Sequence, residues 1–188
     1  FNKRRRHPVG PEDLENGMRE LARLGCTHVV INELARRSAE SGPECEEYYR
    51  FYDYAPDIDQ YVETKLNVGT YPREYLQANL NLLQSIAQLA NKYGLIPGLY
   101  AAHPRSVPET LLKKYPFLRG ARIDHTFRSY EPRYTLSVAH PAVRWHYAEL
   151  IRNLITEVPE LGFIKMLLND SGAGFEYTAS LYSGRNGG

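Results

Sequence analysis

The sequence predicts an α/β fold of parallel β–α repeats, of the TIM-type (β/α)8 barrel class. Three observations predict it: amphipathic helical segments alternate with short apolar runs, glycines follow the helices, and polar residues follow the apolar runs. Such alternation implies parallel strands with helices outside them. A complete barrel needs about 250 residues, whereas this chain has 188 residues and three clear strand segments. We therefore expect residues 1–188 to form one partial domain covering about half of a barrel, with the remainder on sequence outside this chain.

The first repeat begins at residue 11. Pro11 suits the first turn of a helix, and the two acidic residues that follow it complement the positive end of the helix dipole. Leucine and methionine then recur every three or four residues as far as Leu24, and Gly25 ends the helix. The β-branched run at 27–32 indicates a buried strand. Cys26, just before it, is expected to be a small buried hydrophobe.

The second repeat has the same order. A long helix is predicted from Arg73 to the residue before Gly94, and a strand at 95–100 follows it. Pro97 weakens this strand assignment, because a central strand normally uses every backbone N–H. A short helix is expected at 107–115.

The third repeat begins at Pro141, which opens another helix. The apolar face of this helix is predicted to carry Tyr147, Ile151, Leu154 and Val158. The last strand is predicted at 163–168, and a fourth at 134–138. No glycine-rich phosphate-binding motif follows these strands, which favours a closed barrel over an open doubly wound sheet.

Tyrosine is unusually frequent, with 15 residues in the chain. Several of them lie in the polar, acidic stretch 36–70, which interrupts the β–α alternation as a loop insertion after the first strand. Loops in this position lie at the active face of a barrel. This stretch is therefore predicted to be a lid or substrate wall, or else partly disordered. Tyrosine rings and hydroxyls match the apolar faces and hydroxyl rims of sugars.

Charge and composition narrow the classes of partner. The formal net charge of +1 gives no indication of a nucleic-acid or membrane partner, and no apolar run reaches the roughly 18 residues of a membrane span. The run Lys3 to Arg6 is interpreted as a solvated terminus. Cys26 and Cys45 form no disulfide framework, so the compartment stays open. No cofactor is expected.

Polar side chains at the ends of the apolar runs are the candidate site. Because chemistry in barrels comes from the carboxyl ends of strands, we expect these residues to share one rim. The predicted substrate-binding residues are Asn32, Glu33, His103, Arg105 and Asn169, and the predicted catalytic acid is Asp170 with Glu176 in reserve. Amides and carboxylates bind hydroxyl pairs, arginine binds a carboxylate or a diol, and a carboxylic acid can protonate a leaving oxygen.

Metal binding is the rival interpretation of the same residues. Histidine and carboxylate side chains in this set could supply metal ligands, namely His103, His125, His140, Glu33 and Asp170. The chain has neither of the compact metal-binding spacings His-x-His and His-Glu-x-x-His, so the sequence does not favour a metal site.

Two segments resemble a known family. The stretch 29–35, which contains Asn32 and Glu33, resembles the first-strand asparagine motif of the bacterial and fungal α-glucuronidases. The stretch 137–174 is similar to a longer part of that family: His140 and Pro141 open a helix, a Pro-Glu-Leu-Gly-Phe turn follows at 159–163, and a strand ends at Asn169. The pattern at 140–147 is shared more widely, including by hexosaminidase-like barrels.

The resemblance implies a glycoside hydrolase barrel that acts on a glycan, including uronic-acid-containing glycans, by carboxylate acid/base catalysis. Its general acid is the glutamate of an Asn-Ser-Glu-Gly or Asp-Ser-Glu-Gly motif, where this chain has Ser171 or Gly172. That departure leaves two alternatives open: a non-catalytic carbohydrate-binding barrel, and a metal-dependent hydrolase or isomerase barrel.

Overall fold

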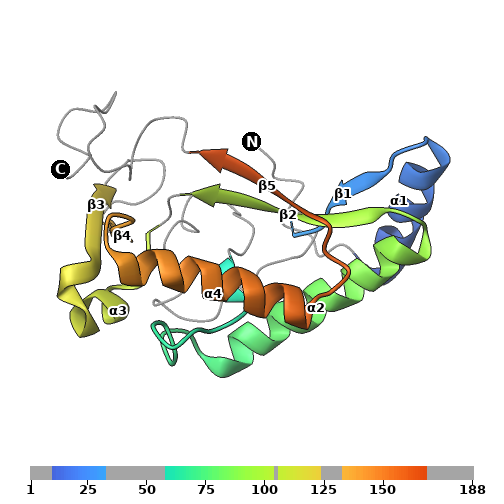
Figure 1. Cartoon of the computed structure of the whole chain (residues 1–188). Helices are drawn as coiled ribbons and strands as arrows, with labels where there is room; N and C mark the ends of the chain where they lie inside the picture. Colours follow the sequence, from blue (N-terminus) through green and yellow to red (C-terminus); the bar gives the residue numbers. More distant parts are fainter. Residues whose placement is uncertain (1–9, 33–57, 104–105, 124–132, 169–188) are drawn as a thin grey trace.

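A computed structural model describes residues 10–32, 58–103, 106–123 and 133–168. These residues form a mixed α/β fold with a three-stranded parallel sheet and a separate two-stranded antiparallel sheet (Figure 1). The predicted α/β class and the parallel strands are confirmed. The described strands do not close into a barrel.

The parallel sheet contains β1 (His28–Val30), β2 (Ile96–His103) and β5 (Phe163–Leu168), in the order β1-β2-β5. The helix α1 (Pro11–Arg23) precedes β1, α2 (Arg73–Lys92) connects β1 to β2, and α4 (Pro141–Glu157) leads into β5. All three helices lie where the sequence predicts them. Gly25 and Gly94 follow α1 and α2 with φ of 80° and 71°, which is the left-handed conformation that glycine adopts without strain.

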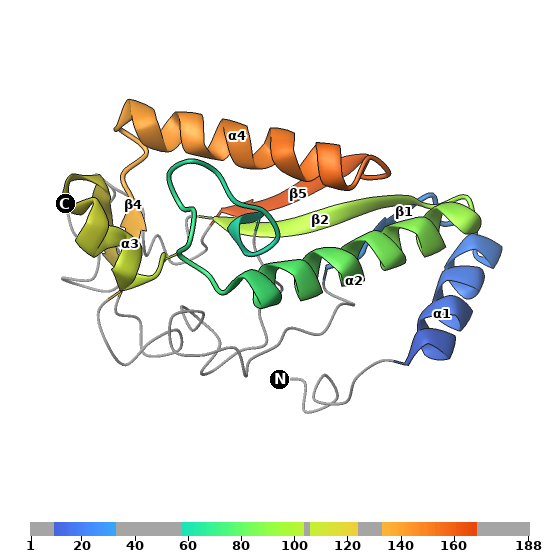
Figure 2. The ribbon, with the colours of Figure 1, turned by 90° about the horizontal axis from the view of Figure 1, so that it is seen from below.

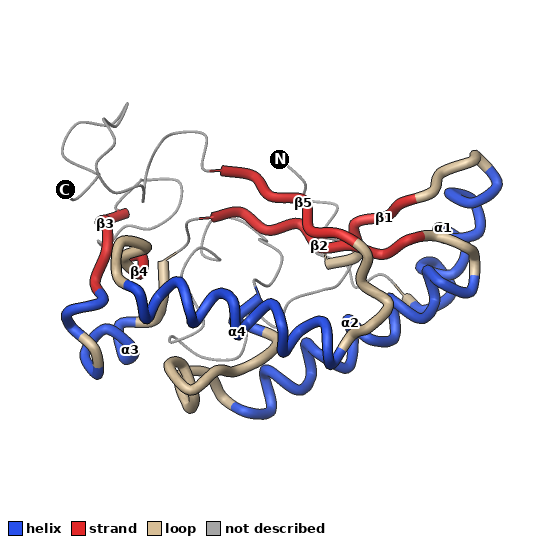
Figure 3. Tube along the Cα trace, viewed as in Figure 1, coloured by secondary structure: helices blue, strands red, loops and turns tan. Residues whose placement is uncertain are grey.

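One face of this sheet is covered by helices. Alternate strand residues, among them Val29, Ile31 and Leu99, join α1, α2 and α4 in one buried apolar cluster. Figures 1 and 2 show α2 and α4 on the same side of the sheet, and Figure 3 shows the helices and the parallel strands as two layers. The opposite face of β1, β2 and β5 carries no described helix.

Strand β2 is central, and two of its residues explain how it accommodates its neighbours. The β2–β5 ladder begins at Gly98, which pairs with Phe163, so Pro97 lies one residue before the point where β5 needs an N–H from β2. The carbonyl of Pro97 still accepts a hydrogen bond from Gly162 at 2.9 Å. A side chain at Gly98 would occupy the space of the Phe163 ring, which explains the glycine.

The predicted fourth strand is confirmed, but its expected place in the parallel sheet is wrong. The strand β4 (Arg133–Leu136) exists, but it pairs antiparallel with β3 (Arg119–Ile123), which the sequence did not indicate. A short helix α3 (Glu109–Lys114), close to the predicted one, and the 3₁₀ turn η4 (Pro116–Leu118) precede this pair. They enclose a second apolar cluster with the start of α4. Figure 1 shows this unit beyond the ends toward which β2 and β5 point.

The described part of the tyrosine-rich stretch belongs to the core. The 3₁₀ turn η3 (Ile58–Gln60) and the residues after it pack into the cluster beneath the helices, and Tyr61 is only 2% exposed. For Tyr61, the predicted substrate wall is therefore wrong: its ring fills the core. Tyr48, Tyr49, Tyr52 and Tyr54 lie outside the described residues.

A buried polar cluster fixes the turn that follows. The Nδ1 atom of His146 in α4 lies 2.7 Å from Thr64 Oγ1, and the side chain of Asn67 accepts a hydrogen bond from the Thr64 N–H at 2.7 Å. His146 is 3% exposed, and burial lowers its pKa to about 4, with Glu149 partly opposing the shift. The cluster ties α4 to residues 64–67.

Two expectations about burial are wrong. Cys26 is exposed, because it follows the glycine turn at the end of α1 and lies before the first paired residue of β1. Ile151 is 37% exposed, while Leu154 and Val158 are buried as predicted. The sheet-facing side of α4 instead takes Leu150, one residue earlier. No helix among the described residues is long and apolar enough to cross a membrane.

Candidate functional site

The carboxyl ends of β1, β2 and β5 lie at one edge of the sheet, because the three strands are parallel and adjacent. Asn32 follows β1 at this edge. His103 is the last residue of β2, and it pairs with Leu168, the residue before Asn169. The structure therefore brings the ends of the three strands that precede the predicted motifs to the same edge of the sheet.

Asn32 is held in a specific way at this edge. Its Nδ2 donates to the Tyr100 carbonyl at 2.8 Å, and its Oδ1 accepts from the Tyr100 N–H at 2.8 Å. The side chain therefore makes the two hydrogen bonds to β2 that the backbone of one more β1 residue would make. It is 1% exposed. The geometry gives Asn32 a positioning role, which holds Tyr100 at the end of β1.

The helix-free face of the sheet carries an aromatic and cationic group of side chains midway along β2 and β5. Tyr100 and Lys165 are neighbours across the β2–β5 ladder, and the Lys165 Nζ lies 5.5 Å from the centre of the Tyr100 ring. Further along the same face, His28 and Phe163 make an edge-to-face contact with centroids 5.4 Å apart. Lys165 is exposed, so its ammonium group can meet a ligand.

This arrangement defines a chemical preference. A tyrosine ring offers a face for the C–H surface of a sugar, and a lysine ammonium offers three donors to a carboxylate or to hydroxyl groups. Figure 1 shows the β3–β4 unit beyond the end toward which β2 and β5 point. The ring of Tyr100 and the ammonium group of Lys165 therefore suit an anionic, polyhydroxylated ligand.

The other predicted site residues stay predictions. Glu33, Arg105, Asn169, Asp170 and Glu176 lie outside the described residues, and the side chain of His103 does too. Of the metal-ligand candidates, His140 caps the start of α4 by accepting the Ala142 N–H on Nδ1 at 3.2 Å. Within the described ranges, no three histidine, cysteine or carboxylate side chains are grouped to hold a metal ion.

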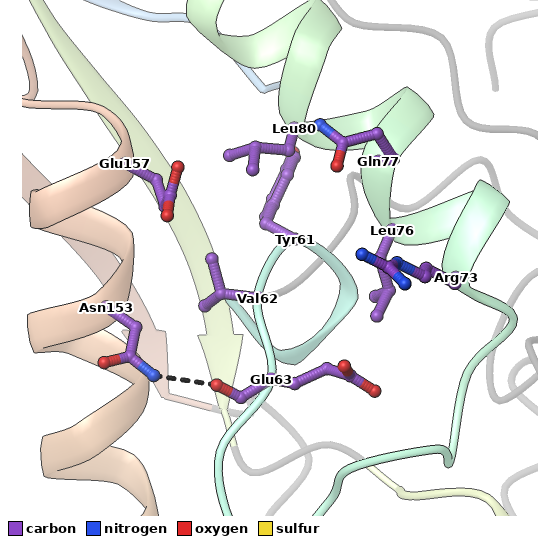
Figure 4. Close-up of a pocket in the computed structure, with 9 residues that line it drawn as sticks. All are labelled: Tyr61, Val62, Glu63, Arg73, Leu76, Gln77, Leu80, Asn153 and Glu157. Carbon is purple, nitrogen blue, oxygen red and sulfur yellow. Dashed lines mark hydrogen bonds between the residues drawn. The ribbon is translucent and has the colours of Figure 1, made fainter.

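A cavity of about 300 Å³ lies elsewhere, between α2, α4 and residues 61–63 (Figure 4). It is on the helix-covered side, and none of its lining residues comes from a strand. Asn153 donates to the Glu63 carbonyl at 2.7 Å, and the Glu63 carboxylate accepts the Gly69 N–H at 2.8 Å. These polar groups hold the 63–69 turn in place, so we do not assign the site to this cavity.

No family model, curated protein or solved structure matches the chain.

Tyr100 and Lys165 are not among the residues that the sequence predicted for the site. Both lie inside apolar strand segments, whereas the predicted residues all follow such segments. The signal that could have found them is the lysine in the apolar run 163–168, since a charged residue within a strand needs an exposed or functional face.

Proposed function

We propose that this chain is part of a (β/α)8-type barrel that processes a carbohydrate, and that it acts as a glycoside hydrolase on uronic-acid-containing glycans. The observation that carries the proposal is the pairing of Tyr100 with the exposed Lys165 on the helix-free face of the parallel sheet, midway along β2 and β5. A ring face and an adjacent ammonium group match the C–H face and the carboxylate of a uronic acid.

The arrangement of helices supports a barrel over a doubly wound sheet. Strands β1, β2 and β5 lie side by side in the sheet in the same order as they occur along the chain. The helices α1, α2 and α4 cover a single face of this sheet. Doubly wound folds place helices on both faces, whereas barrels keep every helix outside and leave the inner face to strand side chains. The single helix-covered face of β1, β2 and β5 therefore matches the outer face of a barrel.

The proposed general acid is Asp170, which comes two residues after the end of β5. A rigid strand fixes the start of that segment, and catalytic groups need fixed positions. Glu176 is the reserve acid. Either group would protonate the leaving oxygen of the glycoside.

Kinetics test this assignment. Asp170→Asn is expected to lower kcat on an unactivated uronide by a factor of about 100 or more, because general-acid catalysis contributes that much. It should have little effect on a substrate whose leaving group needs no protonation. Asp13→Asn, on the exposed first turn of α1, is the matched control. Near wild-type turnover in both Asp170→Asn and Glu176→Gln would place the proton donor elsewhere.

A non-catalytic carbohydrate-binding barrel is the second candidate. It is favoured by the described side chains on the helix-free face, where Tyr100 and Lys165 supply a ring and a cation, groups that can bind an acidic sugar without catalysis. Binding of an acidic oligosaccharide without turnover of any glycoside would support this candidate over the hydrolase.

A further inference from the structure

The unit formed by α3, η4, β3, β4 and the first turns of α4 has an excess of positive charge. Its residues at 106–122 and 134–147 include a single acidic residue, Glu109, and that carboxylate is paired with Arg119. The lysines and arginines of these two ranges are Lys113, Lys114, Arg119, Arg122 and Arg144. The whole chain, by contrast, has a formal net charge of only +1. This local excess favours an anionic partner.

A row of aromatic rings extends from one of these cations. The Nζ atom of Lys114 lies 5.1 Å from the centre of the Tyr115 ring. The Tyr115 and Phe117 rings meet edge to face with centroids 6.2 Å apart, and the Phe117 and His140 rings follow with centroids 5.6 Å apart. The contacts therefore join the end of α3, through η4, to the residue that caps α4.

A second cation lies at the other end of this row. Arg144 follows His140 by one turn of α4, and its Nη1 donates to the carbonyls of residues 138 and 139 at 2.9 and 2.7 Å. These bonds fix the guanidinium group beside the residues that precede His140. Glu149, the next acidic residue along α4, lies on a different side of the helix from Arg144, and its charge acts on the buried His146 instead.

The ring in the middle of the row is open to solvent. Phe117 is 67% exposed, whereas its neighbour Leu118 is buried in the apolar cluster of this unit. A lone exposed ring needs no explanation. A ring that lies between a lysine and a fixed arginine, however, matches the C–H face and the carboxylates of an acidic glycan.

We propose that these five residues, called the Phe117 patch, bind a segment of an acidic polysaccharide apart from the site on the parallel sheet. The patch consists of Lys114, Tyr115, Phe117, His140 and Arg144. A sugar ring stacks on Phe117, and carboxylates of the same chain meet the two cations. The choice of a uronic-acid-containing glycan rests on the proposed function. One open ring with a cation on each side also suits separated carboxylates better than the phosphate at every nucleotide of a nucleic acid.

Binding of the full chain to immobilised polygalacturonate, a polymer of a uronic acid, tests the proposal by biolayer interferometry. Phe117→Ala is expected to raise Kd by at least about fivefold, because it removes the stacking ring. Lys114→Gln should raise it by about threefold or more. The matched controls Leu24→Ala, at a side chain 63% exposed, and Arg73→Gln, at an exposed arginine that starts α2, should leave Kd unchanged. Circular dichroism checks that each variant folds.

Repeating the comparison in a Lys165→Met background separates this patch from the sheet site. The proposal predicts that Phe117→Ala still weakens binding there. If Phe117→Ala and Lys114→Gln bind polygalacturonate like their parent chains in both backgrounds, the patch is not a glycan site, whatever the effect of Lys165→Met. Conversely, a patch effect with no effect of Lys165→Met would support the patch and count against the sheet site of the proposed function.

Single-stranded polyuridylate is the competing ligand. It should bind more weakly than polygalacturonate, and its binding should not depend on Phe117. Tighter binding of polyuridylate that Phe117→Ala weakens would assign the patch to nucleic acid and overturn the proposal. A chain that does not bind polygalacturonate at all would overturn it as well.

Discussion

Asn32→Asp is expected to lower the free energy of unfolding by on the order of 3 kcal/mol at neutral pH. The Asn32 amide donates to the Tyr100 carbonyl and accepts the Tyr100 N–H, both at 2.8 Å, and it is buried. A carboxylate has no hydrogen to donate, so its second oxygen would face the Tyr100 carbonyl oxygen. Its negative charge would also be buried away from water. Urea unfolding followed by circular dichroism measures the change.

The destabilisation caused by Asn32→Asp should depend on pH in a defined direction. Burial against a carbonyl raises the pKa of the introduced carboxyl, so the loss should shrink as the pH falls toward about 4 and the group is protonated. Asn81→Asp, on the exposed side of α2, is the control and should change stability by less than about 0.5 kcal/mol. If Asn32→Asp unfolds like the wild type, the proposed positioning role of Asn32 is wrong.

Stability should fall between neutral pH and pH 4 because of His146. Burial lowers the pKa of this imidazole from 6.5 to about 4 in the folded chain. Between these values the unfolded chain binds a proton that the folded chain does not, so stability rises with pH across this window. The full effect is on the order of 3 kcal/mol, present above pH 6.5 and lost as the pH falls to about 4.

His146→Asn separates this effect from other titrations. Asparagine keeps a polar atom near Thr64 but does not gain or lose a proton in this pH range. The difference between wild type and variant in the slope of unfolding free energy against pH therefore reports on His146. His28→Asn, at an exposed histidine, is the control. Glu15 and Glu20 have pKa values lowered by Lys92 and Arg23, and they add a loss of the same sign only below about pH 4.5. Identical slopes in wild type and His146→Asn between pH 5 and 6.5 would contradict this account.

The sequence predicted the parallel sheet well because local signals define its parts. Proline at the start of α1 and α4, glycine after α1 and α2, and apolar runs at β1, β2 and β5 are each read within a few residues. The predicted edge with Asn32 and His103 followed, since parallel strands share their carboxyl ends.

The pairing of β3 with β4, and its antiparallel orientation, could not be predicted from such local signals. The strand β3 has basic residues at Arg119 and Arg122, so it lacks the continuous apolar run that marked the other strands in the sequence. Arg119 is held by an ion pair with Glu109 and by the Tyr134 ring, 4.3 Å from its guanidinium carbon. Ile151 fits an apolar helical period, but α4 has apolar residues on two sides, so the period alone did not select the buried one.

Calorimetric titration with an oligosaccharide that carries a terminal uronic acid, and with its neutral counterpart, tests the central claim most directly. We predict that the acidic oligosaccharide binds more tightly, and that Lys165→Met weakens its binding by about tenfold or more while leaving binding of the neutral ligand unchanged. Lys65→Met, at an exposed lysine outside the sheet, should leave both affinities unchanged. Equal binding of the two ligands, or an acidic ligand that binds Lys165→Met as tightly as the wild type, would contradict the claim.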